Sequence, residues 1–74
     1  MEEKAYIIEM LRARAIKEES HNPEYWDGYL RGLRRQFHGD KFGTESEHQL
    51  WLTMSGDEFQ RQRSEGYRAG YSKQ

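Results

Sequence analysis

Three arginines and five aromatic residues lie within residues 25–42 of this sequence, and these residue types are suited to recognising another molecule. Arg31 and Arg35 are four residues apart, so on a helix they share one face, with Arg34 beside them. Tyrosine and arginine are enriched at the energetic centres of protein interfaces. We therefore predict a partner-binding surface made of Tyr25, Tyr29, Arg31, Arg34, Arg35 and Phe42.

These arginines suit two kinds of partner. A guanidinium group pairs with the carboxylates of a protein or with the phosphates of a nucleic acid, and an aromatic ring can stack on a base. The formal net charge of the chain is -1, so no overall positive field draws it to nucleic acid. Asp27 also precedes Arg31 by four residues and balances part of the local charge. We favour a protein partner, with RNA or DNA bound through Arg31, Arg34 and Arg35 as the alternative.

Residues that could bind a metal or catalyse a reaction lack the spacing that those tasks require. His38, Asp40, Glu47 and His48 are close in sequence, but the last two are adjacent and point about 100° apart on a helix. The chain has no cysteine, and neither a serine nucleophile elbow nor a phosphate-binding loop is present. We expect no catalytic residue, no metal and no cofactor, and hence a binding protein rather than an enzyme.

The elements that position these side chains are predicted to be helices throughout. Apolar residues recur with helical spacing, most regularly at Tyr25/Trp26, Tyr29/Leu30, Leu33 and Phe37. No alternating strand pattern and no long linker interrupts them. We expect one all-α domain over residues 1–74, a small bundle of three to four short helices at about 2–20, 23–38, 45–54 and 58–71.

Local signals mark where these helices begin and end. Asn22 can cap a helix whose first position is Pro23, because proline lacks the N–H that would be unpaired there. Gly39 follows the same helix as a C-terminal cap. Thr44 and Glu47 have the spacing of a capping box, which predicts the start of the third helix.

Two helical segments carry an unusual pair of glycines each: Gly28 and Gly32 in one, and Gly66 and Gly70 in the other. A glycine inside a helix costs roughly 1 kcal/mol relative to alanine, so something should offset the four of them. Our main interpretation is that these two helices cross at the glycines, with each neighbouring tyrosine packed over the other helix. The alternative is that one glycine face stays open to receive a partner, which would include a second copy in a homodimer.

The composition limits where the chain would function. With no cysteines it needs no oxidising compartment, so we expect a cytoplasmic location. No apolar run approaches the roughly 20 residues that span a bilayer, and the first residues do not resemble a signal peptide. We therefore expect no membrane partner. Only 34% of the residues are hydrophobic, so the core should depend on the ten aromatic residues.

Residues 26–32 (WDGYLRG) and 65–70 (EGYRAG) resemble the two glycine-aromatic helical segments of ribosome modulation factor. Members of that family are small bacterial helical proteins that bind ribosomal RNA and pair inactive ribosomes, so the resemblance implies a helical fold and an RNA partner. In its general character the chain also resembles short accessory proteins of phages and prophages, of which anti-CRISPR proteins are one class. That resemblance implies an inhibitor that contacts proteins of the host machinery.

Overall fold

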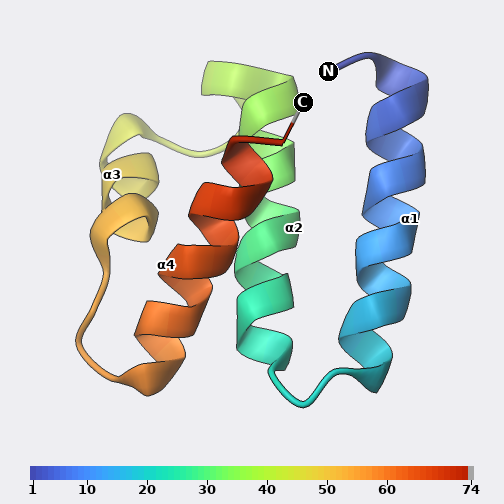
Figure 1. The fold of residues 1–74 in the computed structure, drawn as a ribbon. Coiled ribbons are helices and arrows are strands. Elements are labelled where there is room, and N and C mark those ends of the chain that lie inside the picture. The colour runs from blue at the N-terminus through green and yellow to red at the C-terminus, as the bar shows by residue number, and fades with distance from the viewer. Residues whose placement is uncertain (74) are drawn as a thin grey trace.

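Four α-helices make up most of the chain in the computed structural model, which describes residues 1–73 (Figure 1). Helix α1 spans Glu3–Glu19, α2 spans Pro23–His38, α3 spans Glu45–Thr53 and α4 spans Glu58–Tyr71. A short 3-10 helix, η1, covers Gly39–Lys41. No strand occurs among residues 1–73. The predicted all-α fold is confirmed, and every predicted helix boundary lies within one residue of the observed one.

The four helices lie side by side in a flat arrangement, in the spatial order α3, α4, α2, α1 (Figure 1). Its Cα atoms extend over 35 × 31 × 16 Å, so the molecule is much thinner than it is wide. Helix α2 packs against α4 in the centre, α1 packs against α2, and α3 packs against α4. The two central helices run parallel, since the chain returns through α3 and the segment after it before α4 begins.

The sequence signals for helix ends are mostly those that the structure uses. Gly39 ends α2 with a positive φ of 61°, and Thr44 and Glu47 form both hydrogen bonds of a capping box at the start of α3. Pro23 occupies the first position of α2 as predicted. The cap expected from Asn22 is wrong, because its side chain bonds the hydroxyl of Ser20 and not the first turn of α2.

The centre of the molecule is a glycine seam between α2 and α4, made by Gly28, Gly32, Gly66 and Gly70. A Cβ atom added to Gly28 would come within 2.9 Å of the backbone nitrogen of Tyr67, and closer still to the carbonyl oxygen of Arg63. The glycine hydrogen that takes the place of this Cβ therefore points at a backbone carbonyl of the other helix, the arrangement of a Cα–H···O contact. The predicted crossing at the glycines is confirmed.

The seam is reciprocal, which gives the molecule an approximate twofold symmetry. A Cβ on Gly66 would meet the carbonyl oxygen of Tyr25 and the nitrogen of Tyr29, which have the same positions relative to Gly28 as Arg63 and Tyr67 have relative to Gly66. Gly32 and Gly70 repeat the relation one turn later. Both glycine faces are thus used within one chain, so the expectation that one stays open for a partner or a second copy is wrong.

The tyrosines beside the glycines pack outward from the seam. Tyr29 of α2 lies toward α1, where its hydroxyl donates a hydrogen bond to Glu9. Tyr67 of α4 lies toward α3, where its hydroxyl is 2.5 Å from Nδ1 of His48. The prediction that each tyrosine covers the other central helix is therefore wrong, because the backbones approach too closely to leave room for a ring between them.

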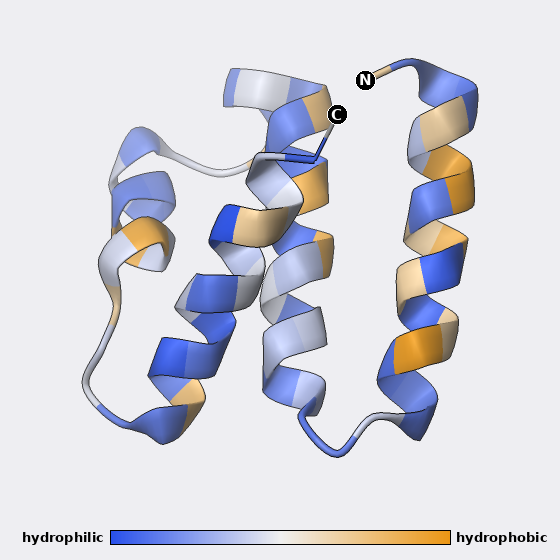
Figure 2. Ribbon diagram, in the orientation of Figure 1, coloured by the Kyte–Doolittle hydropathy of each residue, from blue (hydrophilic) through white to orange (hydrophobic). Residues whose placement is uncertain are grey.

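Each side of the seam has its own small core. Between α1 and α2 the buried apolar residues are Ala13, Tyr29, Leu30 and Leu33, with Tyr6, Met10 and Trp26 partly buried around them. Between α3 and α4 the rings of His48, Trp51 and Tyr67 pack together. Figure 2 shows the consequence, since the two central helices are coloured mainly pale or hydrophilic and the strongest hydrophobic colours lie on α1.

Candidate binding cleft

An open cleft of about 610 Å³ lies between side chains of α1, α2 and α3. Residues of α1 and α2 line it, together with Trp51 of α3. We call it the arginine cleft, and its lining residues are Arg14, Lys17, Glu18, Asp27, Leu30, Arg31, Arg34 and Trp51. Four of these side chains are positively charged and two are negatively charged, so the cleft is locally positive although the chain as a whole is not.

The cations of the cleft differ in how they are paired. Lys17 forms an ion pair of 2.6 Å with Asp27 across the α1–α2 contact. Arg31 has a looser pair of 3.6 Å with Glu47, and its guanidinium carbon lies 4.6 Å from the centre of the Trp51 ring. Such a stacked arginine is held in place without losing its outward hydrogen-bond donors.

Two guanidinium groups in the cleft have no charged partner within the part of the chain that the structure describes. Among residues 1–73, no ion pair or side-chain hydrogen bond involves Arg14 or Arg34. Arg34 is only partly exposed. These two groups, together with Arg31, can each donate paired hydrogen bonds to an anionic group that enters the cleft.

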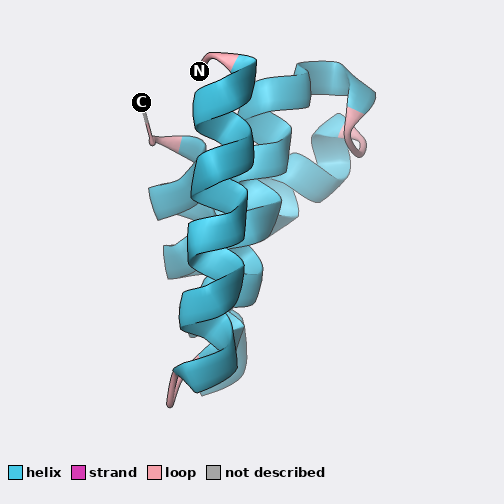
Figure 3. Cartoon of the chain, turned by 90° about the vertical axis from the view of Figure 1, so that its right-hand side faces the viewer, coloured by secondary structure: helices cyan, strands magenta, loops and turns pink. Residues whose placement is uncertain are grey.

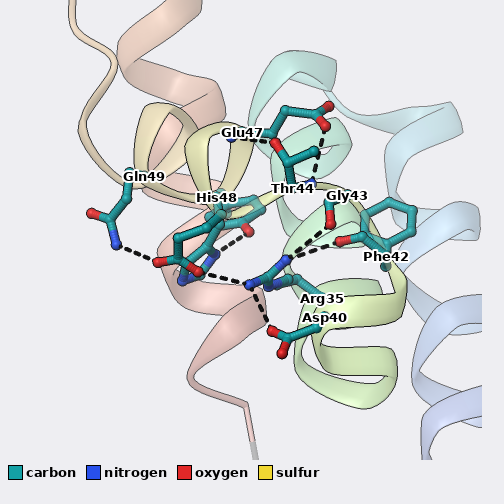
Figure 4. Close-up of polar contacts among 10 residues, drawn as sticks. Arg35, Asp40, Phe42, Gly43, Thr44, Glu47, His48 and Gln49 are labelled. Carbon is teal, nitrogen blue, oxygen red and sulfur yellow. Dashed lines mark hydrogen bonds and ion pairs between the residues drawn. The ribbon is translucent and has the colours of Figure 1, made fainter.

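Arg35 lies outside the cleft, and the expectation that it is exposed is wrong. Its side chain is only 6% exposed and points into the loop that follows α2 (Figure 4). One nitrogen donates to the carbonyl oxygens of Phe42 and Gly43, at 3.2 and 3.4 Å, and another lies 3.1 Å from a carboxylate oxygen of Glu45. Asp40 adds a longer contact of 3.4 Å. Arg35 therefore fixes the connection between α2 and α3.

Tyr29 is also buried, contrary to expectation, with 5% of its surface exposed. The hydroxyl group bonds the carboxylate of Glu9, which Arg12 holds at 2.5 and 2.8 Å. The hydrogen bonds from Arg12, more than that from Tyr29, lower the pKa of Glu9 to about 2, and burial with the nearby carboxylate raises the pKa of Tyr29 to about 12. This ring is a structural link between α1 and α2.

The four other predicted residues divide between the cleft and its edge. Arg31 and Arg34 line the cleft, as predicted for a contact surface. Phe42 is half-buried beside Arg31, whose guanidinium carbon lies 5.5 Å from its ring centre. Tyr25 is half-buried among the aromatic rings at the start of α2 and does not line the cleft.

Six of the eight residues that line the cleft were not in the predicted contact surface: Arg14, Lys17, Glu18, Asp27, Leu30 and Trp51. Arg14 and Lys17 are three residues apart and so share one face of α1, a signal that was available. Their nearness to Arg31 depends on how α1 packs on α2, which the spacing does not reveal. The aromatic residues were expected to form the core, but Trp51 is only partly buried, and Arg31 lies over its ring.

The histidine and carboxylate residues around the α2–α3 loop have structural contacts. His48 is buried, bonds Tyr67 and packs against the ring of Tyr71 at 4.7 Å between ring centres. Burial raises the pKa of Tyr67. Within residues 1–73, no three histidine, aspartate or glutamate side chains converge as metal ligands would.

Comparison of the chain with protein-family models, with curated proteins and with solved structures finds no match. No helix within residues 1–73 has the length and apolar character needed to cross a membrane. The case for function therefore depends on the geometry and charge of the arginine cleft.

Proposed function

We propose that this chain is a small non-enzymatic binding protein, an accessory or inhibitor that contacts another protein through its arginine cleft. The observation that carries the proposal is the set of three guanidinium groups that line the cleft together with Trp51, of which those of Arg14 and Arg34 have no ion-pair partner among residues 1–73. Acidic side chains of the partner would enter the cleft and accept hydrogen bonds from these groups. Arginine and tryptophan are also the residue types enriched at interface hot spots.

The cleft is partly organised before a partner binds. Arg31 is already stacked on Trp51 and Arg34 is partly buried, so both have lost some side-chain freedom in the free protein. Ordering a long side chain on binding costs about 0.5–1.5 kcal/mol, and part of that cost is avoided here. Buried neighbours such as Leu30 reduce contact with water and strengthen charge-assisted hydrogen bonds.

The carboxylates in the cleft favour a protein partner over a nucleic acid. Glu18 and Asp27 would repel a continuous phosphate backbone, whereas a protein surface can offer cations to them and carboxylates to the arginines. The net charge of -1 likewise provides no general attraction to nucleic acid. The proposed partner is therefore a protein with an acidic surface that also carries basic residues.

RNA or DNA binding, as in ribosome modulation factor, is the second candidate, and one observation favours it. The stacked pair of Arg31 and Trp51 has the chemistry of a base-binding platform, with Arg34 placed to contact a phosphate. Arg35 is bonded to the loop between α2 and α3, so it is not among the residues proposed to bind nucleic acid.

An affinity pull-down from a lysate of the source organism tests the proposal, with the bait as the full chain and as the variant Arg34→Glu. We expect a protein to be captured whether or not nuclease is added, and its capture to fall about 30-fold with the variant, the effect of losing about 2 kcal/mol at an interface centre. The matched control is Arg68→Glu, which reverses the charge of an exposed arginine in the last turn of α4, outside the cleft.

Two results would overturn the protein-partner proposal. If nuclease releases the captured protein and binding of a short RNA weakens steeply with salt, the nucleic-acid alternative replaces it. If Arg34→Glu and Arg68→Glu capture the same proteins as the unmodified chain, the cleft is not the binding site. Circular dichroism spectra of both variants confirm that each keeps its helices.

A further inference from the structure

We propose that the outer face of α1 binds the same face of a second copy of this chain, with the two α1 helices antiparallel. This face is a stripe of exposed residues that we call the outer stripe: Lys4, Ile7, Ile8, Leu11, Ala15 and Glu18. Ile7 is 48% exposed, Ile8 57% and Leu11 60%. Large aliphatic side chains that gather on one exposed face mark an interaction site.

Helix α1 is the edge of the layer and has two different apolar sides. Its inner side packs Tyr6, Met10 and Ala13 against α2. Figure 3 looks toward the other side and shows α1 in front of the remaining helices, with no other element covering it. The apolar residues of the outer stripe are therefore additional to those that hold α1 on the molecule.

The spacing of the outer stripe is that of a helix-pairing seam. Lys4, Leu11 and Glu18 are seven residues apart, and so are Ile8 and Ala15. A repeat of seven keeps the same residues facing a second helix along its whole length. The apolar residues are in the middle of this seam with Arg14 beside them, and Lys4 and Glu18 are at its two ends.

Charge complementarity selects the partner and its direction. When two copies pair antiparallel with Leu11 against Leu11, Lys4 of each copy is level with the partner's Glu18, because both residues are seven positions from Leu11. A parallel pair would instead place like charges together at both ends. A second copy of this chain therefore supplies both the apolar surface and the opposite charges that the outer stripe requires.

The size of the face predicts a weak dimer. Helix α1 has 17 residues and is therefore about 26 Å long. One helix from each copy buries an area at the low end for specific interfaces, below about 1,200 Å². We expect a reversible dimer with a dissociation constant in the micromolar range. The outer stripe shares Glu18 with the arginine cleft, and Arg14 of the cleft is seven residues after Ile7, so the dimer contact borders one edge of the cleft.

Sedimentation equilibrium over roughly 10 μM to 1 mM, the range of weak complexes, measures this association. We expect the unmodified chain to convert from monomer to dimer within that range and not to form larger species. Leu11→Glu should weaken the dimer by at least about 10-fold, since it places two like charges at the centre of the seam. The matched control is Leu50→Glu on α3, where the leucine is 57% exposed and should not affect association.

A charge swap tests the antiparallel direction separately. Lys4→Glu or Glu18→Lys alone places like charges opposite one another and should weaken the dimer by about 3-fold to 10-fold, while the double variant Lys4→Glu/Glu18→Lys should restore it to within about 2-fold. In a parallel dimer the single variants would merely exchange one like-charge contact for another, and no restoration would occur.

Several results would overturn the inference. A chain that stays monomeric up to about 1 mM has no self-association of the expected strength. Equal weakening by Leu11→Glu and Leu50→Glu would place the contact elsewhere or show that association is nonspecific. A dimer that weakens with Leu11→Glu but is not restored by the charge swap does not have the proposed antiparallel register. A monomer whose outer stripe binds lipid vesicles or another protein would assign the face to that occupant.

Discussion

Glu9 is a buried carboxylate whose charge is balanced by its neighbours. It is 8% exposed, and it accepts hydrogen bonds from the Arg12 guanidinium and from the Tyr29 hydroxyl. Removing a carboxylate from water is costly unless such donors replace the water. Arg12 is on the same helix as Glu9, whereas Tyr29 is on α2. The hydrogen bonds that replace water around Glu9 therefore depend in part on the packing of α1 against α2.

The first prediction is that Glu9 makes stability depend on pH. Its pKa is about 2 in the folded chain, against 4.5 for an unperturbed glutamate, so its contribution is fully present above pH 4.5 and is lost as pH falls toward 2. Half of the Arg12 side chain is exposed and screened by water, so we expect a contribution of about 2 kcal/mol. Urea unfolding at pH 7 and pH 2.5 should show Glu9→Gln destabilised at pH 7 and much less destabilised at pH 2.5.

Other carboxylates also titrate in this range, so the difference between variant and unmodified chain is the quantity to compare. Glu19→Gln, at the exposed end of α1, removes the same charge without these partners and should change the unfolding free energy by less than about 0.5 kcal/mol at either pH. A Glu9→Gln variant with the same deficit at both pH values would show that the charge of Glu9 does not contribute.

At the residue scale, side-chain type predicted exposure less well than position in the helix would have done. Tyr29 and Arg35 were expected at the surface because tyrosine and arginine are common in interfaces, yet both are buried. Arg35 is seven residues after Gly28 and three after Gly32, so it shares the face that turns toward the seam. The burial of Arg35 could therefore have been predicted from the sequence. The loop carbonyls that Arg35 binds could not have been predicted, because their position depends on how residues 39–44 fold back.

At the scale of elements, helix propensity and packing oppose each other at the glycine seam. Each glycine lowers the intrinsic stability of its helix, and in exchange the backbones of α2 and α4 come into direct contact. The contacts that result include Cα–H···O interactions and close van der Waals packing along two turns of both helices. This balance explains why the two central helices hold together although neither is strongly hydrophobic.

We predict that Gly28→Ala and Gly66→Ala each lower stability. The higher helix propensity of alanine would by itself raise the free energy of unfolding by about 1 kcal/mol. However, the new methyl group would overlap a backbone carbonyl of the other helix, which cannot move independently of that helix. Overpacking of this kind costs about 3 kcal/mol, which leaves a net loss of about 2 kcal/mol. Thermal unfolding followed by circular dichroism should show a melting temperature lowered by about 8–16 °C, the shift that such a loss causes in a domain of this size.

Glu65→Ala is the matched control, since Glu65 is exposed and adjacent to Gly66 in α4. The same alanine propensity applies there without any overlap, so the melting temperature should stay the same or rise slightly. A rise with Gly28→Ala or Gly66→Ala would contradict the seam as the contact that holds α2 to α4.

The elements themselves could be predicted, but their arrangement could be predicted only in part. The proline at the start of α2, the glycine after it and the Thr44–Glu47 capping box act within a few residues, so local chemistry fixes those boundaries. The glycine pairs also indicated that α2 and α4 cross. The order α3, α4, α2, α1 depends instead on which outward faces pack together, and α1 carries apolar residues on two sides.

At the scale of the whole molecule, the approximate twofold symmetry divides the structure into two halves joined at the seam. Each half is a central helix with one tyrosine that holds a flanking helix: Tyr29 bonds Glu9 of α1, and Tyr67 bonds His48 of α3. The layer is thin, with its smallest extent at 16 Å, so no common core surrounds all four helices. The two flanking contacts should therefore be energetically independent of each other.

Two substitutions, one in each flanking contact, test whether these contacts are energetically independent. Tyr29→Phe and Tyr67→Phe each remove one buried hydroxyl and should each lower the free energy of unfolding by about 1 to 2 kcal/mol. Because the two hydroxyls act on opposite sides of the seam, the double variant should lose the sum of the two effects within about 0.5 kcal/mol. By contrast, the second alanine in Gly28→Ala/Gly66→Ala should cost less than the first, since one clash already separates the same two helices. Urea unfolding gives all of these values, and a coupling above about 1 kcal/mol between the tyrosines would show that the two flanks form a single core.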